Sequence, residues 1–164
     1  MSEENNHLNI LLLARNTTEK GIKQIIEQMK RINHSFNGVN IYLYSFMPCQ
    51  YKDNFQIKVL DPKVDLKLYF KTHYNKLDII IIDDLATFNL DFILFMMYRK
   101  IPLIVDKLIA DHYQDYFIIN ETVLTYSHSQ LHELPFQILN SLKKYQSQNK
   151  ILTSAQKIAL LEDN

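Results

Sequence analysis

The sequence LNILLLARNTTEKGIKQIIEQM, residues 8–29, predicts a buried strand, a short polar loop and an amphipathic helix. Leu8–Ala14 is apolar apart from one asparagine, which is typical of a strand inside a parallel sheet. The apolar residues after the loop recur at the spacing of one helix face, at Ile22, Ile25, Ile26 and Met29. A threonine, Thr17 or Thr18, is expected to cap this helix.

Two cations flank the expected start of this helix. Arg15 follows the strand, and Lys20 stands in the first helical turn. In open α/β sheets, ligands bind in the crevice at the carboxyl ends of the strands. A helix N-terminus beside cations suits a phosphate group, because its backbone N–H groups and positive dipole end face the anion. The sequence therefore predicts a phosphate-binding position at Arg15 and Lys20.

The composition predicts one globular domain over residues 1–164, which is long enough to bury a real core. Hydrophobic residues make up 47% and charged residues 22%, and the formal net charge of zero argues against a nucleic-acid partner. No apolar run reaches the roughly 18 residues of a membrane span, and no signal peptide is recognised. The single cysteine, Cys49, fits a reducing compartment, so we expect a cytoplasmic protein.

Glycine is scarce, with Gly21 and Gly38 the only two in the chain. Nucleotide-binding loops usually need several glycines so that the backbone can approach phosphate. Neither a GxGxxG motif nor a GxxxxGK[ST] motif occurs. This scarcity argues against a dinucleotide dehydrogenase or a P-loop enzyme, and no cofactor is expected.

Beyond residue 29, strand-like and helix-like segments alternate. The expected strands cover residues 39–46, 55–60, 77–82, 102–105 and 117–120. The expected helices cover residues 63–73, 90–98, 107–114 and 154–161, with a long one from Ser127 or Ser129 to about Tyr145 that Pro135 kinks. Such alternation predicts an α/β fold with a single doubly wound, Rossmann-like parallel sheet of about six strands, in the order 3-2-1-4-5-6.

The segment Ala14–Gly21, ARNTTEKG, resembles the opening of the C-terminal, nucleotide-sugar-binding half of group-1 retaining GT-B glycosyltransferases. That family typically has Gly-Arg, three variable residues and Glu-Lys-Gly at this place. The segment Leu77–Asp106 resembles a later strand–loop–helix–strand of the same half. The resemblance implies that Arg15 and Lys20 bind the diphosphate of a nucleoside diphosphate or nucleotide-sugar. It covers one half of a two-domain enzyme.

The second segment departs from the family at its acidic positions. The family has one glutamate that supports the donor sugar and a second that supports the nucleotide ribose. Counted back from Pro102, these positions fall on Thr87, or Ala86 with a shift of one residue, and on Phe95. Lys100 replaces a family glycine. The resemblance therefore implies a degenerate domain whose isolated chain does not transfer sugar, and it defines no catalytic residue.

Two clusters are candidate metal sites. Asp83 and Asp84 could bind Mg²⁺ or belong to a phosphate-receiver domain, but a receiver also needs acids after the first strand. His128 and His132, next to Glu133, have a spacing that can bind zinc, but no third ligand is evident. We expect helix capping, solvated charge and a surface histidine pair at these positions, and no metal.

The sequence thus favours an accessory or scaffolding subunit that pairs with a glycosyltransferase or with an acceptor-binding half. One alternative is an active retaining transferase fragment that moves a hexose from a nucleotide-sugar. Another is a flavodoxin-like or receiver-like signalling module, which would leave the ARNTTEKG segment unexplained. The protein contact is expected on the apolar segment Leu90–Met97, or on the C-terminal helices from Ser129 onward.

Overall fold

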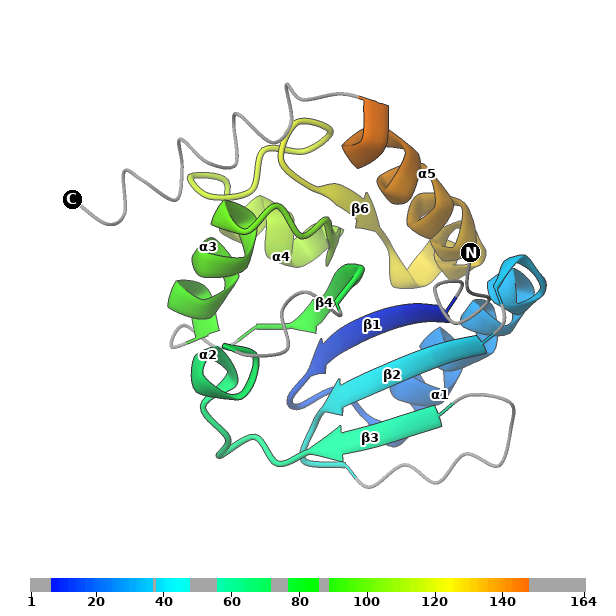
Figure 1. Ribbon diagram of the computed structural model, residues 1–164, viewed down its shortest axis with the longest axis horizontal. Coiled ribbons are helices and arrows are strands. Elements are labelled where there is room, and N and C mark those ends of the chain that lie inside the picture. Colours follow the sequence, from blue (N-terminus) through cyan, green and yellow to red (C-terminus); the bar gives the residue numbers. More distant parts are fainter. Residues whose placement is uncertain (1–6, 37, 48–55, 72–76, 86–88, 148–164) are drawn as a thin grey trace, which may run out of the picture.

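The computed structural model describes residues 7–36, 38–47, 56–71, 77–85 and 89–147. The strands within these ranges form one six-stranded sheet (Figure 1). The strands are β1 (His7–Ala14), β2 (Gly38–Tyr44), β3 (Gln56–Leu60), β4 (Ile79–Asp84), β5 (Leu103–Asp106) and β6 (Leu124–Tyr126). Their order is β3-β2-β1-β4-β5-β6, and every neighbouring pair is parallel. The predicted sheet order and parallel topology are confirmed.

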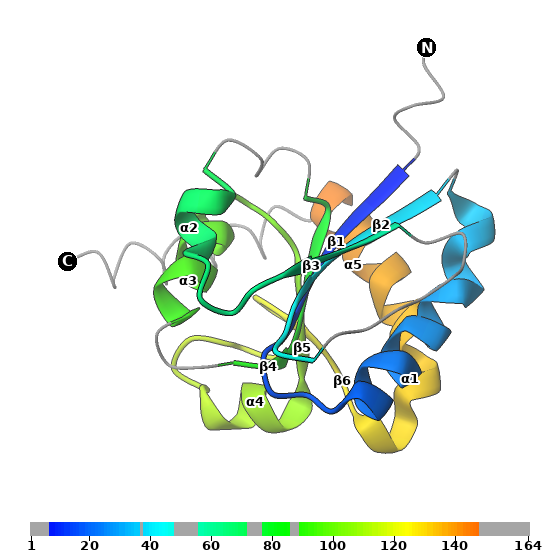
Figure 2. The ribbon, with the colours of Figure 1, turned by 90° about the horizontal axis from the view of Figure 1, so that it is seen from below.

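Helices cover both faces of the sheet (Figure 2). They are α1 (Glu19–Met29), the 3₁₀ helix η2 (Lys30–Ser35), α2 (Leu66–Tyr69), α3 (Leu90–Tyr98), α4 (Lys107–His112), the 3₁₀ helix η5 (His128–Glu133) and α5 (Leu134–Ser147). α1 and α5 pack on one face, and α2, α3 and α4 lie on the other. The predicted doubly wound, three-layer α/β arrangement is therefore confirmed.

The core lies on both sides of the central strands β1 and β4. In β4, Ile79 and Ile81 pack towards α1 and α5, while Ile80 and Ile82 pack towards the opposite helices. All four side chains are fully buried. Because neighbouring residues of a strand point to opposite faces, a strand covered on both faces must be apolar throughout. This explains the uninterrupted apolar runs in the sequence.

The first helix begins where the sequence predicts. Thr18 is the N-cap of α1, and its side-chain oxygen accepts a hydrogen bond from the backbone N–H of Gly21 at 3.1 Å. The four apolar residues of its predicted inner face are all buried. Glu19 stands in the first turn, where the positive end of the helix dipole favours an acid. The strand–loop–helix unit therefore holds its loop firmly at the carboxyl edge of the sheet.

The last strand was predicted in the wrong place. Residues 117–120 end in a tight turn, in which Asn120 has a φ of 65° and the N–H of Ile118 donates to Thr122 Oγ1 at 2.9 Å. The strand follows that turn, at Leu124–Tyr126. Asparagine tolerates a left-handed backbone, and its polarity favours turns over strands. Ile118 and Ile119, which precede Asn120, favour a strand by their residue type, but the backbone turns here.

Two helix predictions differ from the structure, and a third is not tested by it. The helix expected over residues 63–73 covers Leu66–Tyr69 within the described residues. Pro135 lies in the first turn of α5 and does not kink a longer helix, since a residue without an N–H suits that position. The helix expected over residues 154–161 lies outside the described residues. None of the helices that the structure describes is long and apolar enough to cross a membrane.

Candidate functional site

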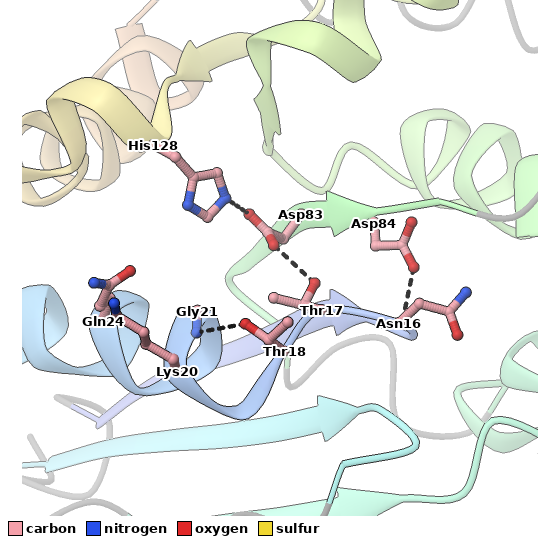
Figure 3. Close-up of a pocket in the computed structure, with 9 residues that line it drawn as sticks. All are labelled: Asn16, Thr17, Thr18, Lys20, Gly21, Gln24, Asp83, Asp84 and His128. Atoms are coloured by element: carbon pink, nitrogen blue, oxygen red, sulfur yellow. Dashed lines mark hydrogen bonds and ion pairs between the residues drawn. The ribbon is translucent and has the colours of Figure 1, made fainter.

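A pocket of about 530 Å³ opens at the carboxyl edge of the sheet, where β1 and β4 end and α1 begins (Figure 3). Its lining residues are Asn16, Thr17, Thr18, Lys20, Gly21, Gln24, Asp83, Asp84 and His128. The sheet order reverses between β1 and β4, so the pocket lies at the topological switch point. Ligands of doubly wound proteins bind at this position.

Two neighbouring aspartates of β4 line this pocket because the strand is irregular there. Ile82 pairs with Leu13, but the next pair joins Asp84 to Ala14, which leaves Asp83 as an extra residue. Such a bulge bends the strand and redirects a side chain. Consecutive residues of a regular strand would point to opposite faces. Here both carboxylates belong to one pocket.

The Asp83 carboxylate is the centre of a hydrogen-bond network. It accepts from Thr17 Oγ1 at 2.8 Å, from His128 Nε2 at 2.5 Å and, in a short contact, from the Tyr126 hydroxyl. Burial, together with the charge of Asp83, raises the pKa of Tyr126 well above its usual value, so this hydroxyl remains a donor. The network joins the loop after β1 to β4, β6 and the start of η5.

Further charges surround this network. Asp84 Oδ2 accepts from the backbone N–H of Asn16 at 2.7 Å, which fixes the loop before α1. Asp106, at the end of β5, is buried. Burial raises the pKa of the Asp106 carboxyl, and the charge of Asp83 raises it further, while His128 acts in the opposite direction. Three aspartates, Asp83, Asp84 and Asp106, therefore lie at the carboxyl ends of β4 and β5.

The structure separates the two predicted phosphate-binding cations. Lys20 lines the pocket from the first turn of α1. Arg15 is not among the lining residues, and its guanidinium lies over the ring of Phe46, 4.8 Å from the centroid. The backbone oxygen of Arg15 accepts from the N–H of Phe46 at 3.0 Å. The assignment of both cations to a diphosphate thus stays a prediction.

Phe95 lies away from the pocket, in a groove between α2 and α3. The side chain is half-buried, with Lys67 Nζ 5.2 Å and Arg99 Cζ 5.1 Å from the ring centroid. Most of Leu90–Met97 is unsuited to the expected protein contact, because its other large side chains are buried or partly buried against the sheet. The alternative contact, on the C-terminal helices from Ser129 onward, stays a prediction. Thr87 and its neighbour Ala86 lie outside the described residues.

Lys100 keeps a backbone geometry that usually requires glycine. Its φ is 68°, its N–H donates to the Met97 oxygen at 3.0 Å, and the N–H of Ile101 donates to the Met96 oxygen at 3.1 Å. These bonds form the motif that closes many helices, with a left-handed residue just after the helix end. The family resemblance also places a glycine here. Lys100 therefore has a positive φ, which is typical of glycine, at the position where the family resemblance places a glycine.

Sequence analysis did not identify the partners of Asp83. His128 was considered with His132 as a zinc pair, but its ring contacts Asp83, and only the backbone oxygen of His132 accepts a bond, from Arg31 at 3.2 Å. Within the described ranges, no group of three or more His, Cys, Asp or Glu side chains is arranged to hold a metal. Polar residues at the carboxyl ends of parallel strands in one sheet, such as Asp83 in β4 and Tyr126 in β6, were the available signal.

The sheet order and the position of the pocket define a doubly wound, Rossmann-like fold, which is similar to that of GT-B glycosyltransferase structures. TarM from S. aureus superimposes with a TM-score of 0.66 at 11% identity, over 97% of this chain and 33% of TarM. The C-terminal CMP-Kdo binding domain of WaaA from Acinetobacter baumannii gives 0.63 at 15% identity, over 93% of this chain and 89% of that domain.

A third similar structure is the Glycosylation Associate Protein (Gap123) complex from Streptococcus agalactiae, with a TM-score of 0.58 at 12% identity. The match covers 100% of this chain and 35% of the Gap123 chain. The chain therefore spans about a third of the length of TarM and of the Gap123 chain. Compared by sequence, the chain matches no family model and no curated protein. These similarities establish the fold.

Proposed function

We propose that the chain is a single GT-B donor-half domain that has lost its ribose and sugar contacts and serves as a cytoplasmic, non-catalytic accessory or scaffolding subunit. The observation that carries this proposal is that Phe95, which the family resemblance aligns with a glutamate, does not line the pocket at the start of α1. The glycine-like backbone of Lys100 supports the alignment that places Phe95 at the position of a family glutamate. A phenyl ring offers no strong acceptor for a ribose hydroxyl. This ring also packs beside Lys67 and Arg99, in a separate groove.

The proposal retains a weak phosphate site at the start of α1. Lys20 lines the pocket there, and the assignment of Arg15 and Lys20 to a diphosphate comes from the family resemblance. Asp83 and Asp84 line the same pocket, and their charges oppose a polyphosphate. We therefore expect nucleoside diphosphates to bind weakly, without the orientation of donor and acceptor that transfer requires.

The proposed partner is a glycosyltransferase or an acceptor-binding half that docks at the carboxyl edge of the sheet. Apolar side chains are exposed along this edge, with Phe46 48% exposed after β2 and Leu108 78% exposed at the start of α4. The fold similarity to the Gap123 complex, whose name describes an assembly of glycosylation-associated protein, supports such a role.

A donor-hydrolysis assay tests the catalytic part of the proposal. The purified chain, supplied with a panel of radiolabelled nucleotide-sugars, should release no more sugar than a boiled control. Phe95→Glu alone should not restore release, because no acceptor is positioned and the sugar contact remains absent. Release above the control that is lost in Arg15→Ala would overturn the non-catalytic reading and favour an active transferase fragment.

A pull-down with mass spectrometry tests the partner. The wild-type chain should retain a glycosyltransferase or an acceptor-binding half, and Leu108→Glu should lose it. Leu68→Glu is the matched control, since Leu68 is 69% exposed but lies on α2, in the separate groove. Equal recovery with Leu108→Glu and the wild type would show that the carboxyl edge is not the docking surface.

A further inference from the structure

The charge of the pocket at the start of α1 depends on one histidine. Its ionisable lining residues are Lys20, His128, Asp83 and Asp84. With a neutral imidazole, these groups carry one positive and two negative charges. Protonation of His128 brings the lining to neutrality. An anionic ligand therefore meets a net negative pocket in one state and a balanced pocket in the other.

Asp83 fixes the orientation of the His128 ring. The Asp83 side chain is 4% exposed, and its Oδ1 lies 2.5 Å from His128 Nε2. A carboxylate that accepts a hydrogen bond from one ring nitrogen determines which nitrogen carries the proton in the neutral ring. The His128 side chain is 42% exposed, so a ligand can reach it. Figure 3 shows the other ring nitrogen turned towards α1, where Gln24 and Lys20 lie.

The charged and titratable groups around His128 come from several elements. Asp83 from β4 contacts the ring, and the charge of Asp106 at the end of β5 also acts on it. Tyr126 of β6 lies beside the ring, with 5.9 Å between centroids, but its hydroxyl donates to Asp83. Lys20 reaches the same pocket from α1. The surroundings of the ring are thus acidic on the sheet side and basic on the α1 side.

We propose that His128 is a further phosphate-binding cation of this pocket, in addition to Lys20, and that its protonation controls the binding of a diphosphate group. This inference rests on the weak phosphate site of the proposed function. In the protonated ring, Nε2–H donates to Asp83 and Nδ1–H donates to a phosphate oxygen. In the neutral ring bound to Asp83 through Nε2–H, Nδ1 presents a lone pair that repels phosphate. The ligand is a diphosphate, alone or on a nucleoside.

Calorimetric titration of the full chain with UDP, at about pH 6 and about pH 8.5, tests the assignment. Wild-type binding should be tighter at the lower pH, and His128→Gln should weaken it there by about tenfold to a hundredfold, the range of one charge-assisted hydrogen bond. His128→Arg should bind at both pH values. His132→Gln, in the same 3₁₀ helix, should match the wild type.

Two further arms separate phosphate recognition from other effects. Pyrophosphate should follow the pattern of UDP, and uridine should bind no variant measurably. The phosphate of UDP also titrates in this range, so each variant is compared with His132→Gln at the same pH. Thermal unfolding shows whether each variant is folded. If His128→Gln does not fold, His128→Arg still tests whether a positive charge at this position binds phosphate.

The outcomes distinguish this inference from the proposed function. If His128→Gln binds UDP as the wild type does at both pH values, the role of His128 is wrong, while the phosphate site at Lys20 stands. If the wild type binds neither UDP nor pyrophosphate, both the retained phosphate site and this inference fail. Binding by His128→Arg that is lost at about pH 8.5, as in the wild type, would also overturn the inference.

Discussion

The pocket at the start of α1 and the groove between α2 and α3 both contain cations, but different forces hold them. In the pocket, buried Asp83 accepts hydrogen bonds from Thr17, Tyr126 and His128, which come from separate parts of the chain. In the groove, Lys67 and Arg99 lie beside the ring of Phe95. The pocket is thus built largely from residues at the ends of strands, whereas the groove is built from side chains on and next to two surface helices.

The largest expected effect concerns phosphate binding in the pocket. Arg15→Ala with Lys20→Ala should abolish the binding of nucleoside diphosphates, because each charge-assisted hydrogen bond contributes about 1.5–3 kcal/mol. Lys20→Ala alone should cost more than Arg15→Ala alone, since only Lys20 lines the pocket. Calorimetry measures the affinity, and stability should change little.

The groove supplies the control for this double variant. Lys67→Ala with Arg99→Ala removes the same charge from the other region and should leave diphosphate affinity unchanged. A loss of affinity in this control as large as in the pocket variant would mean that net charge, and not the pocket, determines binding. Unchanged binding in the pocket variant would show that the phosphate assignment is wrong.

The next effect concerns stability. Asp83→Ala should lower the free energy of unfolding by about 3 kcal/mol, because it leaves buried donors without their acceptor. Asp84→Ala should cost less than about 1 kcal/mol, since the backbone N–H of Asn16 that it bonds is close to water. Urea unfolding measures both changes. Equal costs for the two variants would refute the central role assigned to Asp83.

A smaller effect is expected at the end of α3, beside the groove. Lys100→Gly should raise the free energy of unfolding by about 0.5–1 kcal/mol, because glycine adopts a positive φ without the clash of a Cβ atom. Asn120→Gly is the matched comparison at a φ of 65°, and it should gain less, since asparagine tolerates this conformation. A destabilised Lys100→Gly would contradict the strain inferred from the backbone.

The smallest effect should come from the groove cations themselves. Lys67→Ala and Arg99→Ala should each change the free energy of unfolding by less than about 1 kcal/mol, the range of exposed cation–π contacts. The Lys67 side chain also forms an exposed ion pair with Asp91 at 3.5 Å, which adds little. Urea unfolding decides this point. A cost equal to that of Asp83→Ala would remove the difference between the two regions.

The fold was predictable because its signals are local. Leu8–Ala14 and the helix after it determine a buried strand, a cap and an inner face from spacing alone. The strand at Leu124–Tyr126 was missed because it is short and follows apolar residues that form a turn. Propensity cannot distinguish such short segments.

The site was less predictable because its contacts are distant in sequence. His128 and Asp83 are 45 residues apart, and Thr17 and Asp83 are 66 apart. The bulge at Asp83 has no sequence signature, although it decides that both aspartates face one pocket. A motif comparison identified Lys20, which lines the pocket, but it could not show that the Arg15 side chain lies over Phe46.

The central position of β1 has a consequence for the order of folding. β1 pairs with β2 across a helix, but its other neighbour, β4, brings Asp78 to Asn9 over a separation of 69 residues. Closing so long a loop lowers the entropy of the chain before any stabilising contact forms, and such non-local pairing therefore slows folding. We therefore expect β1, α1 and β2 to associate early. The pocket would form late, when β4 completes the sheet.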